Sequence, residues 1–196
     1  MKSFYISIIL ILSILSCKNK ENKIEKQEKE KAILGYENMP NKETKYDTLF
    51  TLNIADNQKL ITELENKLLK SNFIFGKSNI VLQNSFNNCE QNNIILVKGN
   101  GIRNYNAKSR IAEKNTTMKN VFPDFIITVY EFENKNIADK NYDIIRKALF
   151  SEGHFCNGKA PEKLVQNGNE IYYLSTRAEM FRTYIEKFGE LVKKYR

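Results

Sequence analysis

His154 and Cys156 are the residues of this chain whose types and spacing come closest to a reactive pair. The chain has one histidine, and Cys156 follows it by two positions. An imidazole beside a thiol could activate a nucleophile, and the same side chains could bind a metal ion. A zinc site uses three or four ligands, and only Cys89 is a natural further candidate. We therefore interpret His154 as a loop histidine beside a disulfide and expect no metal.

The acidic and glycine-rich stretches predict no catalysis either. Glu131 and Glu133 alternate with Phe132 on a predicted strand, so we expect both carboxylates to face solvent. The glycine-containing stretches Gly-Asn-Gly at 99–101 and Gly-Lys at 158–159 lack the spacing of a phosphate-binding loop and are typical of turns. A serine triad would need a Gly-x-Ser-x-Gly elbow, which the chain lacks. We expect no cofactor, no catalytic residue and no enzymatic activity.

Residues 1–17 have the composition of a targeting segment. Lys2 gives a positive start, and the apolar run at 4–15 is about half of the roughly 20 residues that span a bilayer. The segment ends in Ile-Leu-Ser-Cys at 14–17, which resembles the lipobox of bacterial lipoproteins. An ordinary secretory signal is the alternative, but Ile14 stands where such a signal needs a small residue. The resemblance covers this segment only.

The lipoprotein resemblance implies a maturation and a location. Residues 1–16 would be removed as a signal peptide, and Cys17 would become the diacylated first residue. Residues 17–46 would form the lipidated N-terminus and a disordered tether, because 18–31 is nearly all Lys, Glu, Asn and Gln. Lys18 is not the aspartate that retains many lipoproteins in the inner membrane. We therefore expect a lipid anchor in the outer membrane of a bacterial cell envelope.

The other two cysteines predict a covalent link in the folded part. Cys89 and Cys156 remain once Cys17 is lipidated. An even number of cysteines in an oxidising compartment favours one disulfide, and two separate buried thiols are the alternative. Such a disulfide would stabilise the fold chiefly by restricting the unfolded chain.

The charge of the chain is basic but scattered. The formal charge is +8, or +7 (8 − 1) once Lys2 is removed with the signal. No arginine-rich run is present, so we expect no nucleic-acid partner. The cations near the C-terminus could bind an anionic partner, or they could serve solubility alone. They are Arg177, Arg182, Lys187, Lys193, Lys194 and Arg196.

Residues 47–196 show both strand and helix patterns. Strand-like runs occupy 48–53, 79–83, 94–98, 124–133, 163–166 and 170–175. Apolar residues at helical spacing predict helices over 60–68, 138–149 and 177–195, the last with a capping box of Thr176 and Glu179. The basic stretch 102–120 is expected to be a long connection. The sequence predicts one α+β domain with a mostly antiparallel sheet of about six strands and three main helices.

Two stretches, 47–101 and 124–176, resemble copies of one β-α-β-β unit. Asn-Ile-Ala-Asp at 53–56 recurs at 136–139, and 81–84 resembles 164–167, both at an offset of 83 residues. Coincidence is the alternative in a chain so rich in Asn and Ile. A true duplication predicts two units around one core, each with its helix on its own sheet.

Adjacent tyrosines give one further expectation about contact surfaces. Tyr172 and Tyr173 lie on a predicted strand, so their side chains point to opposite faces. We expect one ring in the core and the other available for contact.

The function expected from the sequence is non-catalytic. We expect a lipid-anchored envelope protein that binds another macromolecule or supports an envelope complex, with an unidentified envelope protein as partner. A ligand-binding or inhibitor lipoprotein, such as an immunity protein against a toxin, is the alternative. An exposed groove between the two repeats with an apolar lining would favour that alternative, and a flat polar surface would count against it. An envelope hydrolase is the third interpretation and would need His154 or a carboxylate pair in a pocket.

Overall fold

The computed structural model describes residues 39–55, 57–78, 83–114, 120–151 and 156–196. The signal segment, Cys17, most of the tether and His154 lie outside these residues. The described residues form three α-helices and eight strands. The helices are α2 (Gln58–Lys70), α3 (Lys135–Leu149) and α4 (Arg182–Lys194). The strands are β1 (Lys45–Thr51), β2 (Phe73–Lys77), β3 (Gln83–Asn88), β4 (Asn93–Gly99), β5 (Ile102–Ser109), β6 (Asp124–Glu131), β7 (Glu162–Asn167) and β8 (Glu170–Ser175).

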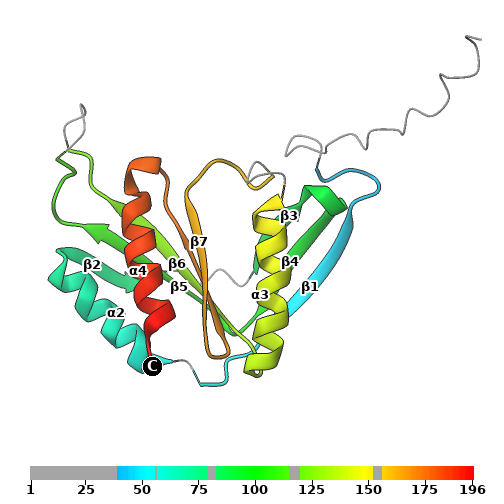
Figure 1. The fold of residues 1–196 in the computed structure, drawn as a ribbon, viewed down its shortest axis with the longest axis horizontal. Helices are drawn as coiled ribbons and strands as arrows, with labels where there is room; N and C mark the ends of the chain where they lie inside the picture. Colours follow the sequence, from blue (N-terminus) through cyan, green and yellow to red (C-terminus); the bar gives the residue numbers. More distant parts are fainter. Residues whose placement is uncertain (1–38, 56, 79–82, 115–119, 152–155) are drawn as a thin grey trace, which may run out of the picture. The chain divides into compact units, whose positions relative to one another are not determined.

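The strands form two sheets, which confirms the α+β class but not a single sheet of about six strands. Sheet A has the order β1-β4-β3, with β1 parallel to β4 and β3 antiparallel to it. Sheet B has the order β2-β5-β6-β8-β7 and is antiparallel throughout (Figure 1). No helix within the described part of the chain is long and apolar enough to cross a membrane.

A glycine turn carries the chain from sheet A to sheet B. β4 and β5 are consecutive in sequence but belong to different sheets, so the change takes place at 99–101. A Cβ atom on Gly101 would lie 2.7 Å from the backbone oxygen of Glu131 and 2.7 Å from the backbone nitrogen of Leu52. Three segments therefore meet at a distance that only glycine permits.

Each sheet buries one face against helices. α2 and α4 cover one face of sheet B, where Leu64, Phe73 and Phe188 belong to the larger apolar core. α3 packs against β3 and β4 and against the β7–β8 hairpin, around Phe86 and Tyr130. Figure 1 shows α3 beside sheet A and α4 beside β7. The periodic stripes of α2 and α3 thus face the cores as expected.

Two local predictions are wrong. The stretch 102–120 was expected to be a connection, but β5 lies in it, between β2 and β6. The capping box of the last helix does not form, because Thr176 Oγ1 donates to the backbone oxygen of Asp124 (2.6 Å) and Glu179 binds Arg182. A 3₁₀ turn over Glu179–Phe181 precedes α4, which therefore begins five residues after the expected 177.

The offset of 83 residues does not align matching elements. Of the first tetrapeptide pair, 53–55 lies in the loop between β1 and α2, whereas 136–139 lies inside α3. Of the second, 83–84 opens β3 whereas 166–167 ends β7. β1 also pairs with β4 in parallel, while β6 pairs with β8 antiparallel. The strand pairing of the two halves therefore lends the duplication no support.

Candidate functional site

The register of sheet B places five residues in one row across the sheet. Asn106 pairs with Gly76 on one side and with Ile126 on the other. Ile126 pairs with Ser175, and Ser175 pairs with Glu162 on the outermost strand β7. Paired residues point to the same face of a sheet, so the row crosses all five strands on one face. The residues next to the row, such as Ala107 and Phe125, are buried toward α2 and α4, so the row lies on the opposite face.

Within the described residues, this part of the sheet has no covering element. Ile126 is 47% exposed although it lies on the middle strand of five. A Cβ atom added to Gly76 would meet no atom within 4 Å. Further along the same face, Tyr130 and Ile171 are fully buried against α3 and sheet A. The second face is therefore packed at one end and open at the other.

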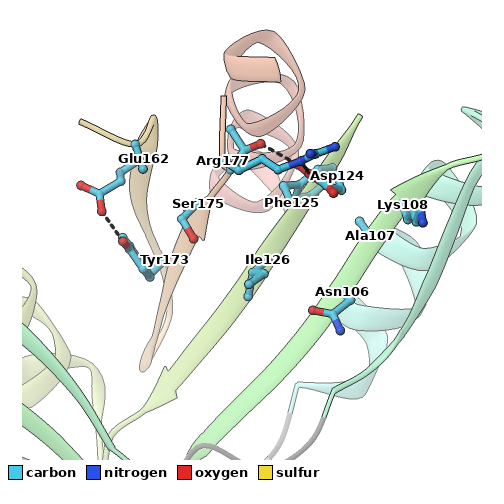
Figure 2. A pocket seen from close by; sticks show the side chains of 12 residues that line it. Asn106, Ala107, Lys108, Asp124, Phe125, Ile126, Glu162, Tyr173, Ser175 and Arg177 are labelled. Atoms are coloured by element: carbon cyan, nitrogen blue, oxygen red, sulfur yellow. Dashed lines mark hydrogen bonds and ion pairs between the residues drawn. The ribbon is translucent and has the colours of Figure 1, made fainter. Parts of the chain in front are cut away.

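A groove of about 560 Å³ lies over the open end. Figure 2 shows that its residues come from β5, β6, the start of β7 and the end of β8. Ile126 and Ala160 give apolar lining, with Asn106 and Ser175 as neutral polar neighbours. Ala107 and Phe125 also border the groove, although their side chains are buried toward α2 and α4. The volume lies within the range of about 300–1,000 Å³ that is typical of small-molecule sites.

Each end of the groove holds an acidic side chain, and the two acids have different partners. At one end Lys108 lies near an ion pair, in which Arg177 Nε donates to Asp124 Oδ1 at 2.9 Å. At the other end the Tyr173 hydroxyl donates to Glu162 Oε1 (Figure 2). The acid at the first end is therefore neutralised by arginine, whereas the acid at the second end is bound by a phenol.

A second hollow of about 340 Å³ adjoins the groove. Glu162 and Tyr173 line both hollows, so they stand at the junction. The second hollow is otherwise lined by Gln83, Asn84, Ser85, Phe86 and Asn157. Its lining is mostly amide and hydroxyl groups, so the combined site is apolar on one side of Glu162 and polar on the other.

Burial shifts the acid–base behaviour of this junction. Loss of solvent raises the pKa of the Glu162 carboxyl above 4.5, and the hydrogen bond from Tyr173 opposes part of that shift. Burial, together with the nearby Glu162, also raises the pKa of the Tyr173 hydroxyl. Tyr130 lies beneath, where burial raises its pKa although Asn84 Nδ2 donates to its hydroxyl at 2.5 Å. Both phenols therefore stay protonated at neutral pH.

Tyr172 and Tyr173 behave as the sequence predicts. Tyr172 is fully buried in the core under α2 and α4, whereas Tyr173 is half-buried on the groove side. The groove itself has no signature in the sequence, because it depends on the pairing of strands far apart along the chain. Glu162 in particular is the first residue of a short strand, β7, with no motif around it.

A second polar cluster lies inside the fold and was predicted incorrectly. Glu131 was expected to face solvent beside Glu133, but it is fully buried, and only Glu133 is exposed. Arg103 lies between two carboxylates, donating to Glu131 Oε2 at 2.7 Å and to Glu170 Oε1. β6 is apolar on both faces near its end, with Tyr130 and Val129 both buried. That pattern is the signal from which burial of Glu131 could have been inferred.

The buried cluster holds the loop that leads into α2. The backbone nitrogen of Ala55 donates to Glu131 Oε1 at 2.6 Å, and that of Asn57 donates to Glu170 Oε1 at 3.1 Å. Every oxygen involved thus binds protein groups. The cluster therefore fixes the crossing from sheet A to the helix on sheet B, and we interpret it as structural.

The predicted disulfide is present. Cys89 and Cys156 are bonded, with their Cα atoms 5.8 Å apart. Met39 and Ile94 pack against the bonded pair in a small apolar cluster. The predicted loop histidine beside the disulfide, His154, lies outside the described residues. No group of three or more His, Cys, Asp or Glu suited to a metal ion occurs in the described part of the chain.

The cations near the C-terminus lie on α4 and on the segments that flank it. Arg177 binds Asp124, and Arg182 Nε donates to Glu179 at 2.5 Å. Lys187 lies five residues after Arg182, which is about 140° around the axis of an α-helix. Lys193 and Lys194 are in the last turn of α4, and Arg196 follows it. A surface for an anionic partner stays a prediction, with the charges of Arg177 and Arg182 balanced by acids.

The comparisons with known proteins give no relative. No family model, no curated protein and no solved structure matches this chain. The groove, the buried cluster and the N-terminal segment are therefore the features from which a function can be argued.

Proposed function

We propose that this chain is a non-catalytic lipoprotein of the bacterial envelope that acts by binding a ligand in the groove on sheet B. The observation that carries the binding role is the uncovered row on sheet B. An apolar side chain in the middle of a five-stranded sheet is normally buried, and here Ile126 is exposed on the floor of a ligand-sized groove. The lipid anchor rests on the resemblance of residues 14–17 to a lipobox.

The groove favours a ligand-binding role over a purely structural one. A support protein needs only complementary outer surfaces, whereas a hollow with an apolar floor and polar ends suits a bound molecule or a chain segment. An inhibitor of the immunity type would use the same groove to hold a segment of its toxin. The outer membrane is the proposed location, because Lys18 follows the proposed lipidated cysteine.

Cross-linking from the groove tests the binding role. A photo-reactive phenylalanine in place of Ile126, in the full-length protein in cells, is expected to give a defined adduct. The matched control is the same amino acid at Ile144, an exposed position on α3 that is 38% accessible. The same adducts from both positions, or none from Ile126, would contradict the proposal. A secreted toxin in the adduct would identify the immunity alternative.

The lipid anchor has its own test. The mature protein is expected to begin at Cys17 with acyl chains on its thiol and amine, and to partition into detergent. Cys17→Ser is expected to abolish the acyl mass. A native product that starts elsewhere and carries no acyl chain would exclude the anchor.

A role in an envelope complex is the second candidate, and β1 is the observation that favours it. β1 is an outer strand of sheet A, and its side chains Tyr46 and Phe50 are 57% and 69% exposed. An outer strand with exposed aromatic side chains can pair with an extended segment of another protein. Phe50→Asp is expected to release such a partner while adducts from Ile126 persist. If Phe50→Asp released no partner, β1 would not have this role.

A further inference from the structure

Glu162 is the groove acid whose charge no cation balances within the described residues. The other acid of the groove, Asp124, is paired with Arg177 at 2.9 Å. Glu162 instead accepts a hydrogen bond from the neutral hydroxyl of Tyr173. Burial is the main influence on its carboxyl, and it raises the pKa. A carboxylate that is partly removed from water and has no cation beside it is stabilised when a ligand supplies that cation.

The surroundings of Glu162 also suit a cation on an apolar stem. Tyr173 lies beside the carboxylate, and its ring meets the ring of Phe86 edge to face at 5.3 Å. Aromatic rings attract cations electrostatically, and they also contact apolar stems. From Glu162 the groove continues over Ser175 and Ile126 toward Asn106. Three strand spacings separate the two ends of that row, which is about 14 Å.

The net charge of the protein does not prevent a cation from binding here. The formal charge is +8 for the full chain, and in the described part of the chain nearly all lysine and arginine side chains are exposed. Such charges are screened beyond a Debye length of about 8 Å at physiological ionic strength. A contact between an ammonium group and the half-buried Glu162 is screened much less.

We propose that the groove binds a ligand with a protonated amine on an apolar stem, with the ammonium group at Glu162 and the stem over Ile126. This inference rests on the proposed function of the groove. A lysyl side chain of a peptide and a free alkylamine share this chemistry. Glu162 accepts the ammonium group, and Tyr173 positions the carboxylate through its hydrogen bond.

Binding of defined probes to the full-length protein in detergent tests the inference. The probes are the peptide acetyl-Phe-Lys-Phe-amide and hexylamine, each with an uncharged match, in which norleucine replaces lysine or hexanol replaces hexylamine. Calorimetry at neutral pH is expected to give at least about tenfold tighter binding of the amine in at least one pair. A preference shown only by the peptide identifies a peptide ligand, and one shown by hexylamine identifies a free amine. Equal binding within both pairs, or no binding by either amine, would overturn the inference.

Variants separate the role of Glu162 from general effects. Glu162→Gln keeps the size of the side chain and is expected to remove the preference for the amine. Glu133→Gln, at an exposed glutamate outside the groove, is the matched control and is expected to leave it unchanged. An unchanged preference in Glu162→Gln refutes the inference. If adducts from Ile126 still form in cells when the amine preference is absent, the groove function stands and only the amine chemistry fails.

Discussion

Replacing Arg103 by methionine removes the guanidinium group that lies between two buried carboxylates. Arg103 donates to Glu131 at 2.7 Å and to Glu170, and the side chains are only 6%, 0% and 1% exposed. Methionine has a similar length without charge, so the change leaves two carboxylates with no cation between them. The expected result is a large loss of stability with the same fold.

The size of the loss follows from the groups that remain. Removing one partner of a buried ion pair costs about 3–5 kcal/mol in the free energy of unfolding. Glu131 keeps the backbone nitrogen of Ala55 as a donor, and Glu170 keeps that of Asn57 and the hydroxyl of Tyr172. These donors place the cost near the lower limit, at about 3 kcal/mol. With a urea slope of about 2 kcal/mol per molar, the unfolding midpoint falls by about 1.5 M.

Urea unfolding followed by circular dichroism measures this change. Arg177→Met is the control, because the Arg177 side chain is 62% exposed, and exposed ion pairs contribute about 0–1 kcal/mol. Its midpoint is expected to fall by less than about 0.5 M. If Arg103→Met does not accumulate, Arg103→Lys retains the charge without the two-sided contact and is expected to lose less.

Amide hydrogen exchange supplies a local readout for the same variant. The amides of Ala55 and Asn57 are bound by the two carboxylates, so their exchange is expected to accelerate more than that of the core strands. The reasoning would be refuted if Arg103→Met behaved like Arg177→Met in urea. It would also be refuted if these two amides kept the protection of the wild type.

Three further predictions concern the disulfide, the glycine turn and the groove acid. The double change Cys89→Ala and Cys156→Ala opens a loop of 67 residues and is expected to lower the free energy of unfolding by about 4 kcal/mol, measured in urea. A loss below about 1 kcal/mol would contradict this prediction. Gly101→Ala places a Cβ atom 2.7 Å from backbone oxygen and is expected to lower the free energy of unfolding by about 2 kcal/mol or more. Gly76→Ala, with open space at its Cβ, is expected to leave the free energy of unfolding unchanged. Equal urea midpoints for the two variants would contradict this prediction. The pKa of Glu162 is raised in the folded state, so its contribution is full below pH 4.5 and is lost as pH rises through the folded value. The stability of Glu162→Gln relative to wild type is therefore expected to rise as the pH increases above about 4.5. Unfolding measured across pH tests this, and a constant difference would contradict it.

The sequence predicts the elements whose pattern is local. The stripe of α2 has the period of a helix with one buried face, and Leu60, Leu64 and Leu68 are fully buried as expected. The disulfide follows from the number of cysteines and the expected compartment. These predictions need no knowledge of which strands pair.

The elements that were missed depend on partners far along the chain. β5 contains Arg103 and Asn104, so it lacks the alternation of an ordinary strand. Both are buried because Glu131 and Thr128 on β6 bind them. Polarity alone therefore hides this inner strand.

The groove was missed for the same physical reason. Its row combines one residue from each of five strands, and the register that aligns them is a property of the sheet rather than of any segment. Burial of Glu162 likewise depends on Tyr173, which lies eleven positions further along the chain and on the neighbouring strand. No motif in the sequence marks either residue.

The packing of Met39 on the disulfide determines how the domain would respond to a mechanical load. A pull on the chain before Met39 acts first on a corner where Cys89 and Cys156 are covalently joined. It next acts on β1, which pairs with β4 in parallel along all seven of its residues, so a lengthwise pull must shear these hydrogen bonds together. Tension arriving from the N-terminal side would thus be resisted by sheet A before it could deform the open face of sheet B.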